Sequence, residues 1–113
     1  MSTIGYVTRK VDEKSKAVSY EGSLRFPGMD EKITIIPNGD KAPNSDQPDF
    51  RIYTAQNFEL GAAWNRKGKQ SGKPYVSLSI STPLLGKTVF ANLGPAPGQS
   101  DKDVLAVIWN PPA

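Results

Sequence analysis

The stretch Ala17-Val-Ser-Tyr-Glu-Gly-Ser-Leu-Arg-Phe26 indicates the fold class, because its side chains alternate in polarity with a period of two. Even-numbered positions from Val18 to Phe26 carry apolar residues or glycine, and odd-numbered positions from Ser19 to Arg25 carry polar ones. Alternation of this kind predicts a β-strand with one buried and one exposed face. The segment 74–81 has the same pattern, with aliphatic residues on three even-numbered positions.

Shorter segments of strand character continue this pattern along the chain. No window carries a 3.6-residue apolar period with helix caps, so no long helix is expected. The predicted fold is all-β, a small antiparallel β-barrel or sandwich of about eight strands. The predicted strands span residues 4–8, 17–26, 32–36, 50–53, 58–64, 74–81, 88–93 and 104–109.

The length of 113 residues is enough for one compact domain, residues 1–113, and too little for two. Within that domain, a shift of 56 positions brings similar residues together. The shift predicts an internal repeat of residues 1–56 and 57–113, in which two four-stranded halves related by a pseudo-two-fold axis share one core. The alternative is a chance similarity between strands of like pattern. Matching pairs are Ile4 with Leu60, Gly5 with Gly61, Lys10 with Arg66 and Tyr20 with Val76, and unlike pairs are Thr8 with Trp64 and Lys16 with Gly72.

The net charge of +3 is concentrated in two short segments. Residues 9–16 hold four bases and two acids, and residues 65–73 hold four bases and no acid. Both segments overlap predicted hairpin tips, at 11–16 and 67–73. The candidate nucleic-acid-binding residues are therefore Arg9, Lys10, Lys14, Lys16, Arg66, Lys67, Lys69, Lys73 and the nearby aromatic Tyr75.

Two interpretations of these basic tips stay open. In the first, the pseudo-symmetry places both tips where they straddle a phosphate backbone, with Trp64 or Tyr75 stacking on bases. In the second, the lysines only keep the hairpin ends soluble and discourage aggregation. Trp64 shares the parity of Phe58 and Leu60, which predicts that its ring packs with them in the core.

The chain contains no His and no Cys, and this absence excludes several kinds of chemistry. It rules out a Ser-His-Asp or Cys-His nucleophile system, a thiolate or imidazole metal site and a disulfide. An enzyme would need a Lys nucleophile, a Ser-Lys pair or a carboxylate pair in a deep pocket, and no sequence context supports one. We therefore expect no catalytic residue, no metal and no cofactor.

Two short motifs resemble ligand sites without completing them. Gly86-Lys87-Thr88 resembles the end of a phosphate-binding loop, but the first glycine of that loop is missing. Asp40, Asp46 and Asp49 lie in one long predicted loop without the spacing of an EF-hand. We expect the first motif to be a turn and the three acids to be solvated, with Asp49 pairing with Arg51 or another base.

No targeting or membrane segment is readable in the sequence. The chain begins directly with a strand-like pattern, without the basic and apolar regions of a signal peptide. No apolar run approaches the roughly 20 residues of a membrane-spanning helix. We therefore expect a cytoplasmic protein that does not enter a membrane.

Several short motifs occur together in one order and cover nearly the whole chain. The most specific are Glu59-Leu-Gly-Ala-Ala-Trp64 and, after it, Tyr75-Val-Ser-Leu78. With them the chain resembles the small bacterial family known as domain of unknown function (DUF) 736. The other motifs are Thr3-Ile-Gly5, Tyr20-Glu-Gly22, Ile35-Ile-Pro37, Pro48-Asp-Phe-Arg-Ile52, Ala91-Asn-Leu93 and Val107-Ile-Trp109.

The resemblance implies little about activity. Members of the family are short, cytoplasmic, mostly proteobacterial proteins, often encoded on mobile or conjugative elements, and no activity defines them. No catalytic residue can be carried over to this sequence. The chain departs from the family pattern in its longer linker, residues 38–47, and in its Asn110-Pro-Pro-Ala tail.

Two hypotheses for the function follow. The first is a non-enzymatic binding module of a mobile genetic element that contacts DNA or RNA through the two basic tips. The alternative is a protein-interaction module, such as an adaptor or an inhibitor of host defence, that uses an edge strand or the sheet surface around Tyr75, Ser77 and Ser79. We expect a monomer or a homodimer, because open sheet edges invite dimerisation.

Overall fold

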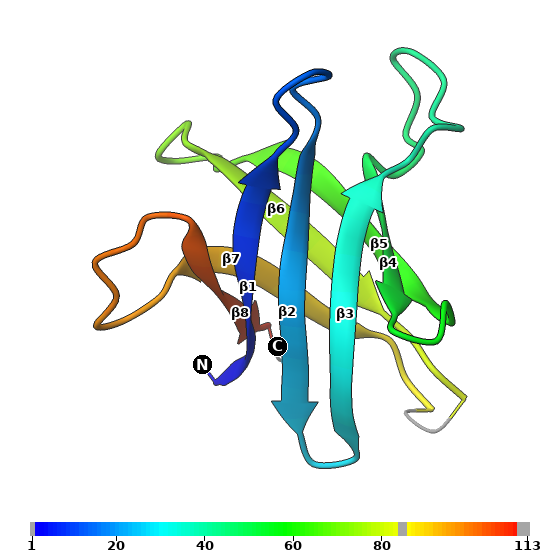
Figure 1. Ribbon diagram of the computed structural model, residues 1–113, viewed down its shortest axis with the longest axis vertical. Coiled ribbons are helices and arrows are strands. Elements are labelled where there is room, and N and C mark those ends of the chain that lie inside the picture. Colours follow the sequence, from blue (N-terminus) through cyan, green and yellow to red (C-terminus); the bar gives the residue numbers. More distant parts are fainter. Residues whose placement is uncertain (1, 84–85, 111–113) are drawn as a thin grey trace.

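The computed structural model describes residues 2–83 and 86–110 and shows one closed antiparallel β-barrel (Figure 1). Each strand pairs with the next one in the chain, and β8 closes the barrel by pairing with β1. The all-β prediction is confirmed, closure identifies a barrel instead of a sandwich, and no helix occurs among the described residues. The strands are β1 (Thr3–Val11), β2 (Val18–Phe26), β3 (Met29–Pro37), β4 (Phe50–Thr54), β5 (Glu59–Lys67), β6 (Pro74–Ile80), β7 (Val89–Pro95) and β8 (Val104–Trp109).

Closure of the barrel gives every strand two neighbours. A closed barrel removes the edge strands on which β-addition and edge-to-edge pairing depend. The hypotheses that placed a protein partner or a second copy on an exposed edge strand therefore lose their structural basis. The Asn110-Pro-Pro-Ala tail, a departure from the family pattern, lies outside the described residues from position 111 onward.

The barrel interior is filled by the aliphatic side chains that the alternating pattern places on one face. β-Branched and aromatic residues favour this pleated, half-buried surface. One core prediction is wrong, because Phe58 lies in the β4–β5 connection and is 51% exposed. The largest fully buried side chains are Val7, Leu24, Ile35, Ile52, Leu78, Ile80 and Val107.

A β-bulge interrupts the alternation once in each half of the barrel. The pairing of β4 with β5 skips one residue, Leu60, and the pairing of β8 with β1 skips one residue, Ile4. Both side chains are buried, with 2% and 5% exposure. A bulge bends the strand and shifts its alternation by one position. The two bulges are 56 positions apart, the offset of the predicted repeat.

The bulge at Leu60 reverses the face on which Trp64 was expected. Beyond the bulge, the buried Ala63 pairs with the buried Leu78, whereas Trp64 pairs with the partly exposed Ser77. Directly opposed residues of neighbouring strands point to the same face of the sheet. The indole therefore lies on the outside of the barrel, and the prediction that it packs in the core is wrong.

The glycines that follow the two bulges occupy places where neighbouring strands approach closely. A Cβ on Gly5 would collide with the carbonyl oxygen of Ser23, and a Cβ on Gly61 would collide with that of Ser79. Only glycine fits such an approach. These two contacts are also 56 positions apart, and the β1–β2 and β5–β6 ladders have the same register at that offset. An origin of the halves by duplication stays a prediction.

Candidate nucleic-acid interface

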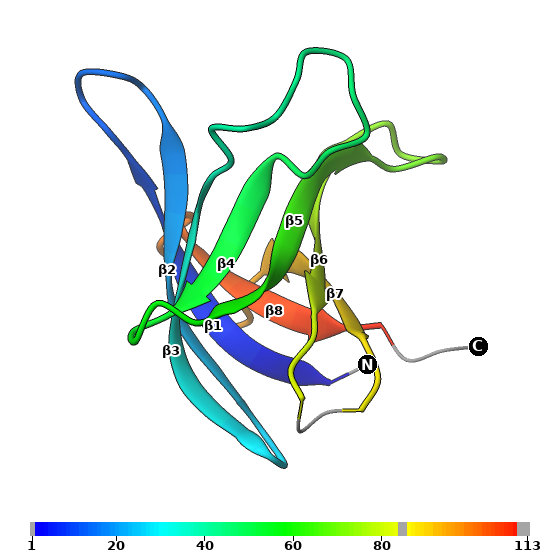
Figure 2. The ribbon, with the colours of Figure 1, turned by 90° about the vertical axis from the view of Figure 1, so that its right-hand side faces the viewer.

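Four connections lie at one end of the barrel, which we call the loop end (Figure 1). Successive strands of an antiparallel barrel alternate in direction, so the β1–β2, β3–β4, β5–β6 and β7–β8 connections all emerge at this end. The two basic tips therefore share one end, although two strands separate them in either direction around the barrel. Figure 2 shows them on opposite sides. A ligand that touches both must cross the mouth of the barrel.

The two tips have the same backbone turn. In the β1–β2 tip the amide of Lys16 donates to the carbonyl oxygen of Asp12 (2.8 Å), and in the β5–β6 tip the amide of Gly72 donates to that of Gly68 (2.9 Å). Lys16 and Gly72 both have a positive φ, of 62° and 67°. Lys16 and Gly72 are unlike in sequence but adopt the same left-handed conformation. Glycine adopts this conformation without steric cost, whereas lysine adopts it at a steric cost.

Two of the four cations of the β1–β2 tip form ion pairs with acids of the same protein. Arg9 pairs with Asp103, which precedes β8 (3.9 Å), and Lys10 pairs with Glu21 on β2 (3.4 Å). A serine hydroxyl within the turn donates to Asp12 (2.7 Å) and lowers the pKa of that carboxyl, which favours its ionised form. The two lysines of the turn form no ion pair within the described residues, but two acids stand beside them in the sequence and reduce the local positive charge.

The cations of the β5–β6 tip have no such partners. None of the four bases, Arg66, Lys67, Lys69 and Lys73, forms an ion pair with an acid in the described part of the chain. The guanidinium of Arg66 lies 5.6 Å from the ring centroid of Trp64. This cation–π contact positions the side chain without neutralising its charge. The tip is thus a concentrated positive surface.

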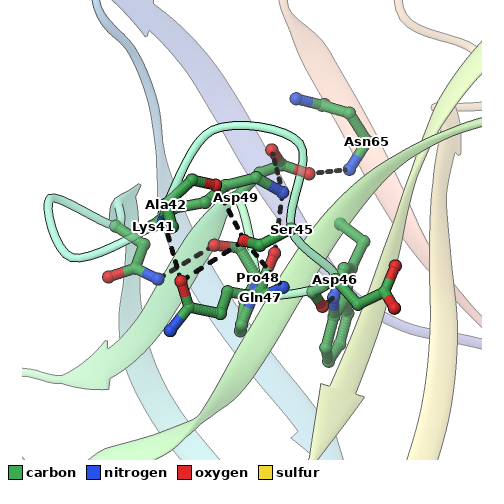
Figure 3. Close-up of polar contacts among 10 residues, drawn as sticks. Lys41, Ala42, Ser45, Asp46, Gln47, Pro48, Asp49 and Asn65 are labelled. Atoms are coloured by element: carbon green, nitrogen blue, oxygen red, sulfur yellow. Dashed lines mark hydrogen bonds and ion pairs between the residues drawn. The ribbon is translucent and has the colours of Figure 1, made fainter.

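The β3–β4 loop is braced against β5 (Figure 3). Asp49 accepts a hydrogen bond from the backbone amide of Asn65 (2.8 Å) and pairs with Lys41 (3.0 Å). Burial raises the pKa of Asp49, but these two hydrogen bonds and the charges of Lys41 and Arg66 outweigh burial and lower it below its ordinary value. The loop is therefore held to β5 by an ionised carboxylate.

The outer face of the β5–β6 tip also gathers aromatic side chains. The indole N–H of Trp64 donates to the carbonyl oxygen of Asp46 in the braced loop (3.2 Å), which fixes the ring. Arg66 lies opposite Tyr75 in the β5–β6 ladder, so both side chains start from the same face. The structure thus brings together the cations and both aromatic residues that the sequence indicated for this tip.

Neither of the other two motifs has the features of the ligand site that it resembles. No group of three or more side chains suited to hold a metal occurs among residues 2–83 and 86–110, so the three acids of the β3–β4 loop are not such a site. The predicted pairing of Asp49 with a base is met by Lys41, whereas Arg51 pairs with Glu59 (3.2 Å). Gly86-Lys87-Thr88 belongs to the β6–β7 connection at the other end of the barrel, and a strand follows it.

A cleft of about 530 Å³ opens beside the β5–β6 tip, and the sequence analysis missed it. β6 pairs with β7 only from Ser77 to Ile80, so the two strands separate toward the loop end. Continuing their register would put Pro74 opposite Pro95, and neither proline has an N–H with which to extend the ladder. The cleft is lined mainly by residues of β6, β7, β8 and the β7–β8 loop, with one residue each from β2 and β5; among the main lining residues are Tyr75, Val76, Leu93, Pro95, Gln99 and Leu105.

No helix of the described residues is long and apolar enough to cross a membrane.

Comparison with known proteins identifies a family and no individual relative. No curated protein and no solved structure matches the chain. A family model described as "Protein of unknown function (DUF736)" matches residues 3–112, a span that includes both hairpin tips and the cleft. The chain therefore belongs to the DUF736 family, as its motifs predicted.

Proposed function

We propose that the protein is a non-enzymatic module that binds nucleic acid at its loop end, chiefly through the β5–β6 tip. The observation that carries the proposal is the group of four bases on this tip, none of which forms an ion pair with an acid within the described residues. Cations placed in this way attract phosphates, because binding releases the counterions condensed on the nucleic acid. The rings of Trp64 and Tyr75 add faces on which bases can stack.

The β1–β2 tip has a secondary role in this proposal. Arg9 and Lys10 would have to leave Asp103 and Glu21 before either could contact a phosphate. An exposed ion pair contributes only about 0–1 kcal/mol, so breaking one in order to bind a phosphate costs little free energy. The net gain in binding free energy is still smaller than the gain from a lysine that forms no ion pair. We therefore expect both tips to contribute, with unequal weights.

The salt dependence of binding tests the proposal. Fluorescence anisotropy of labelled single-stranded and duplex oligonucleotides would be measured between roughly 50 and 200 mM salt. Single strands of about 12 nucleotides match the site size of small barrel-type binding domains. The logarithm of the affinity should fall linearly with the logarithm of the salt concentration. Absence of binding at the lowest salt, or affinity that ignores salt, would contradict the proposal.

A charge-removal variant identifies the surface. Lys67→Gln, Lys69→Gln and Lys73→Gln together should weaken binding to a single strand and reduce the salt slope by about 2, at ~0.7 per cation. All three side chains are exposed, so the fold should survive, and thermal unfolding provides that control. An unchanged slope in a folded variant would place the contact elsewhere.

A protein-interaction module is the second candidate, and one observation favours it. Phe90 of β7 is 54% exposed and lies opposite Ser79 of β6, on the sheet surface predicted for this role. Exposed aromatic side chains on a sheet are common at protein interfaces when they form a patch. Co-purification from the native host distinguishes the candidates. A stoichiometric protein partner that survives nuclease treatment would favour this one.

A further inference from the structure

The cleft between β6 and β7 has the size of a small-ligand site and reaches the barrel interior. Its volume of about 530 Å³ lies within the range of roughly 300–1,000 Å³ that is typical of ligand pockets. Tyr20, a core residue of β2 with 6% exposure, contributes to its lining. The corresponding ladder of the other half has no such opening, because β2 pairs with β3 from Tyr20 to Phe26 without a break.

The lining combines apolar surface with two side-chain amides. Tyr75, Leu93 and Leu105 supply apolar surface, and Asn65 and Gln99 supply the amides. Each amide carries donors and an acceptor, the combination that recognises the edge of a nucleobase. Neither side-chain amide makes a hydrogen bond within the described part of the chain, so both are available to a ligand.

The β5–β6 tip lies at the rim of this cleft. Lys73 directly precedes Pro74, which lines the cleft, and Arg66 lies opposite Tyr75 in the β5–β6 ladder. The β7–β8 loop adds one lysine and one acid to the same lining. A strand whose phosphates contact the tip therefore has its bases next to the walls of the cleft. Charge outside and flat apolar surface inside is the arrangement that single-strand-binding proteins use.

We infer that this cleft takes an unstacked nucleobase of a single-stranded nucleic acid, which stacks on Tyr75 and is hydrogen-bonded by Gln99. The inference rests on the proposed function, because the tip must first hold the backbone. A base within a duplex is already stacked and paired, and its extraction costs free energy. The cleft thus gives the protein a binding preference for exposed single strands over other polyanions.

Two probes of equal length and equal charge test the inference, a single-stranded oligonucleotide and an abasic oligomer. The protein should bind the oligonucleotide at least about fivefold more tightly, the gain expected from one stacked base. Tyr75→Leu should remove most of this gain and leave the salt slope unchanged, because it alters no charge. Tyr53→Leu on β4, which does not line the cleft, is the matched control and should retain the gain.

A second variant, in the β7–β8 loop, tests the inference without a substitution in β6, where Tyr75 lies. Gln99 lies exposed in the β7–β8 loop, so Gln99→Ala should fold and should weaken binding of the oligonucleotide but not of the abasic oligomer. Equal binding of the two probes by the unaltered protein would overturn the base-binding cleft and leave the proposed function standing. Failure to bind either probe at low salt would instead contradict the proposed function itself.

Discussion

The β1–β2 and β5–β6 hairpins have the same backbone and differ in the partners of their charges. Both end in a turn with equivalent hydrogen bonds, both begin with a bulged strand, and both contain a glycine in close contact with the neighbouring strand. In the first hairpin, Arg9 and Lys10 pair with acids. In the second, no base forms an ion pair with an acid among the described residues.

The barrel topology determines where each tip lies, and the side chains on a tip determine whether it can bind a polyanion. Matching ladders deliver both tips to the loop end, as the topology requires. Two acids of the first hairpin, Glu21 and Asp12, correspond to Ser77 and Gly68 in the second. Because the second hairpin has no acid at these positions, the β5–β6 tip is positive, and this tip is the one that we expect to bind.

The largest effects should come from the close contacts that both hairpins share. Gly5→Ala and Gly61→Ala should each lower the free energy of unfolding by roughly 2–3 kcal/mol, because the new Cβ meets a backbone carbonyl oxygen held in the ladder. Gly39→Ala is the control, since its Cβ would meet no heavy atom within 4 Å. Urea denaturation measures all three. A loss confined to one hairpin would show that the two are not equivalent.

A smaller effect should follow from exchanging the residue with positive φ in each turn. Gly72→Ala should cost about 1 kcal/mol, because its Cβ meets no neighbour and only the unfavourable φ remains. Lys16→Gly should stabilise by about 0.5 kcal/mol, since relief of the same strain is partly offset by the freer unfolded chain. Thermal unfolding checks both signs. If both substitutions changed the stability in the same direction, the two turns would not share this conformation.

Removing acids from the β1–β2 hairpin should make it resemble the β5–β6 hairpin in binding. Glu21→Gln with Asp103→Asn releases two bases, so affinity for a single strand should rise several-fold and the salt slope should grow by about 1. Glu59→Gln with Asp30→Asn makes the same charge change at the opposite end of the barrel. An equal gain from this control would mean that net charge, and not the tip, controls affinity.

The smallest effect is expected at low pH, for the contact between Asp49 and the Asn65 amide that holds the β3–β4 loop to β5. Burial raises the pKa of Asp49, but the hydrogen bonds from Asn65 and Lys41 bring it below the ordinary 3.8. A lowered folded-state pKa contributes stability that is present above the unfolded value and is lost as the pH falls through the folded one. In an NMR titration, the shift of the Asn65 amide should therefore have its midpoint below the ordinary carboxyl value of 3.8. Asp49→Asn should abolish this step, and a step near neutral pH would contradict it.

The strands were predictable because alternation is a local property of the sequence. Every predicted segment overlaps a strand of the barrel, in the predicted order. The face of Trp64 was not predictable from parity, because one extra residue at Leu60 shifts the alternation of β5. The signal available was Gly61 directly after the bulge, since a glycine inside a strand pattern often marks such an irregularity.

The candidate site was predictable only in part. The bases of both tips are visible in the sequence, but the pairing of Arg9 with Asp103 joins residues that are far apart in the chain. The cleft depends on the register of β6 against β7, in which Pro74 and Pro95 would meet if the ladder continued. Each proline alone indicates a strand end, and the relation between the two prolines becomes apparent only in the folded barrel.

A direct comparison of the two tips is the sharpest test. Three lysines of each tip would be changed to glutamine: Lys67, Lys69 and Lys73 in one variant, and Lys10, Lys14 and Lys16 in the other. Salt-dependent anisotropy with a single-stranded oligonucleotide should show a loss of about tenfold and a slope lower by about 2 for the β5–β6 variant, and a smaller change of both for the β1–β2 variant. Equal losses, or a greater loss from the β1–β2 variant, would contradict the assignment of binding to the β5–β6 tip.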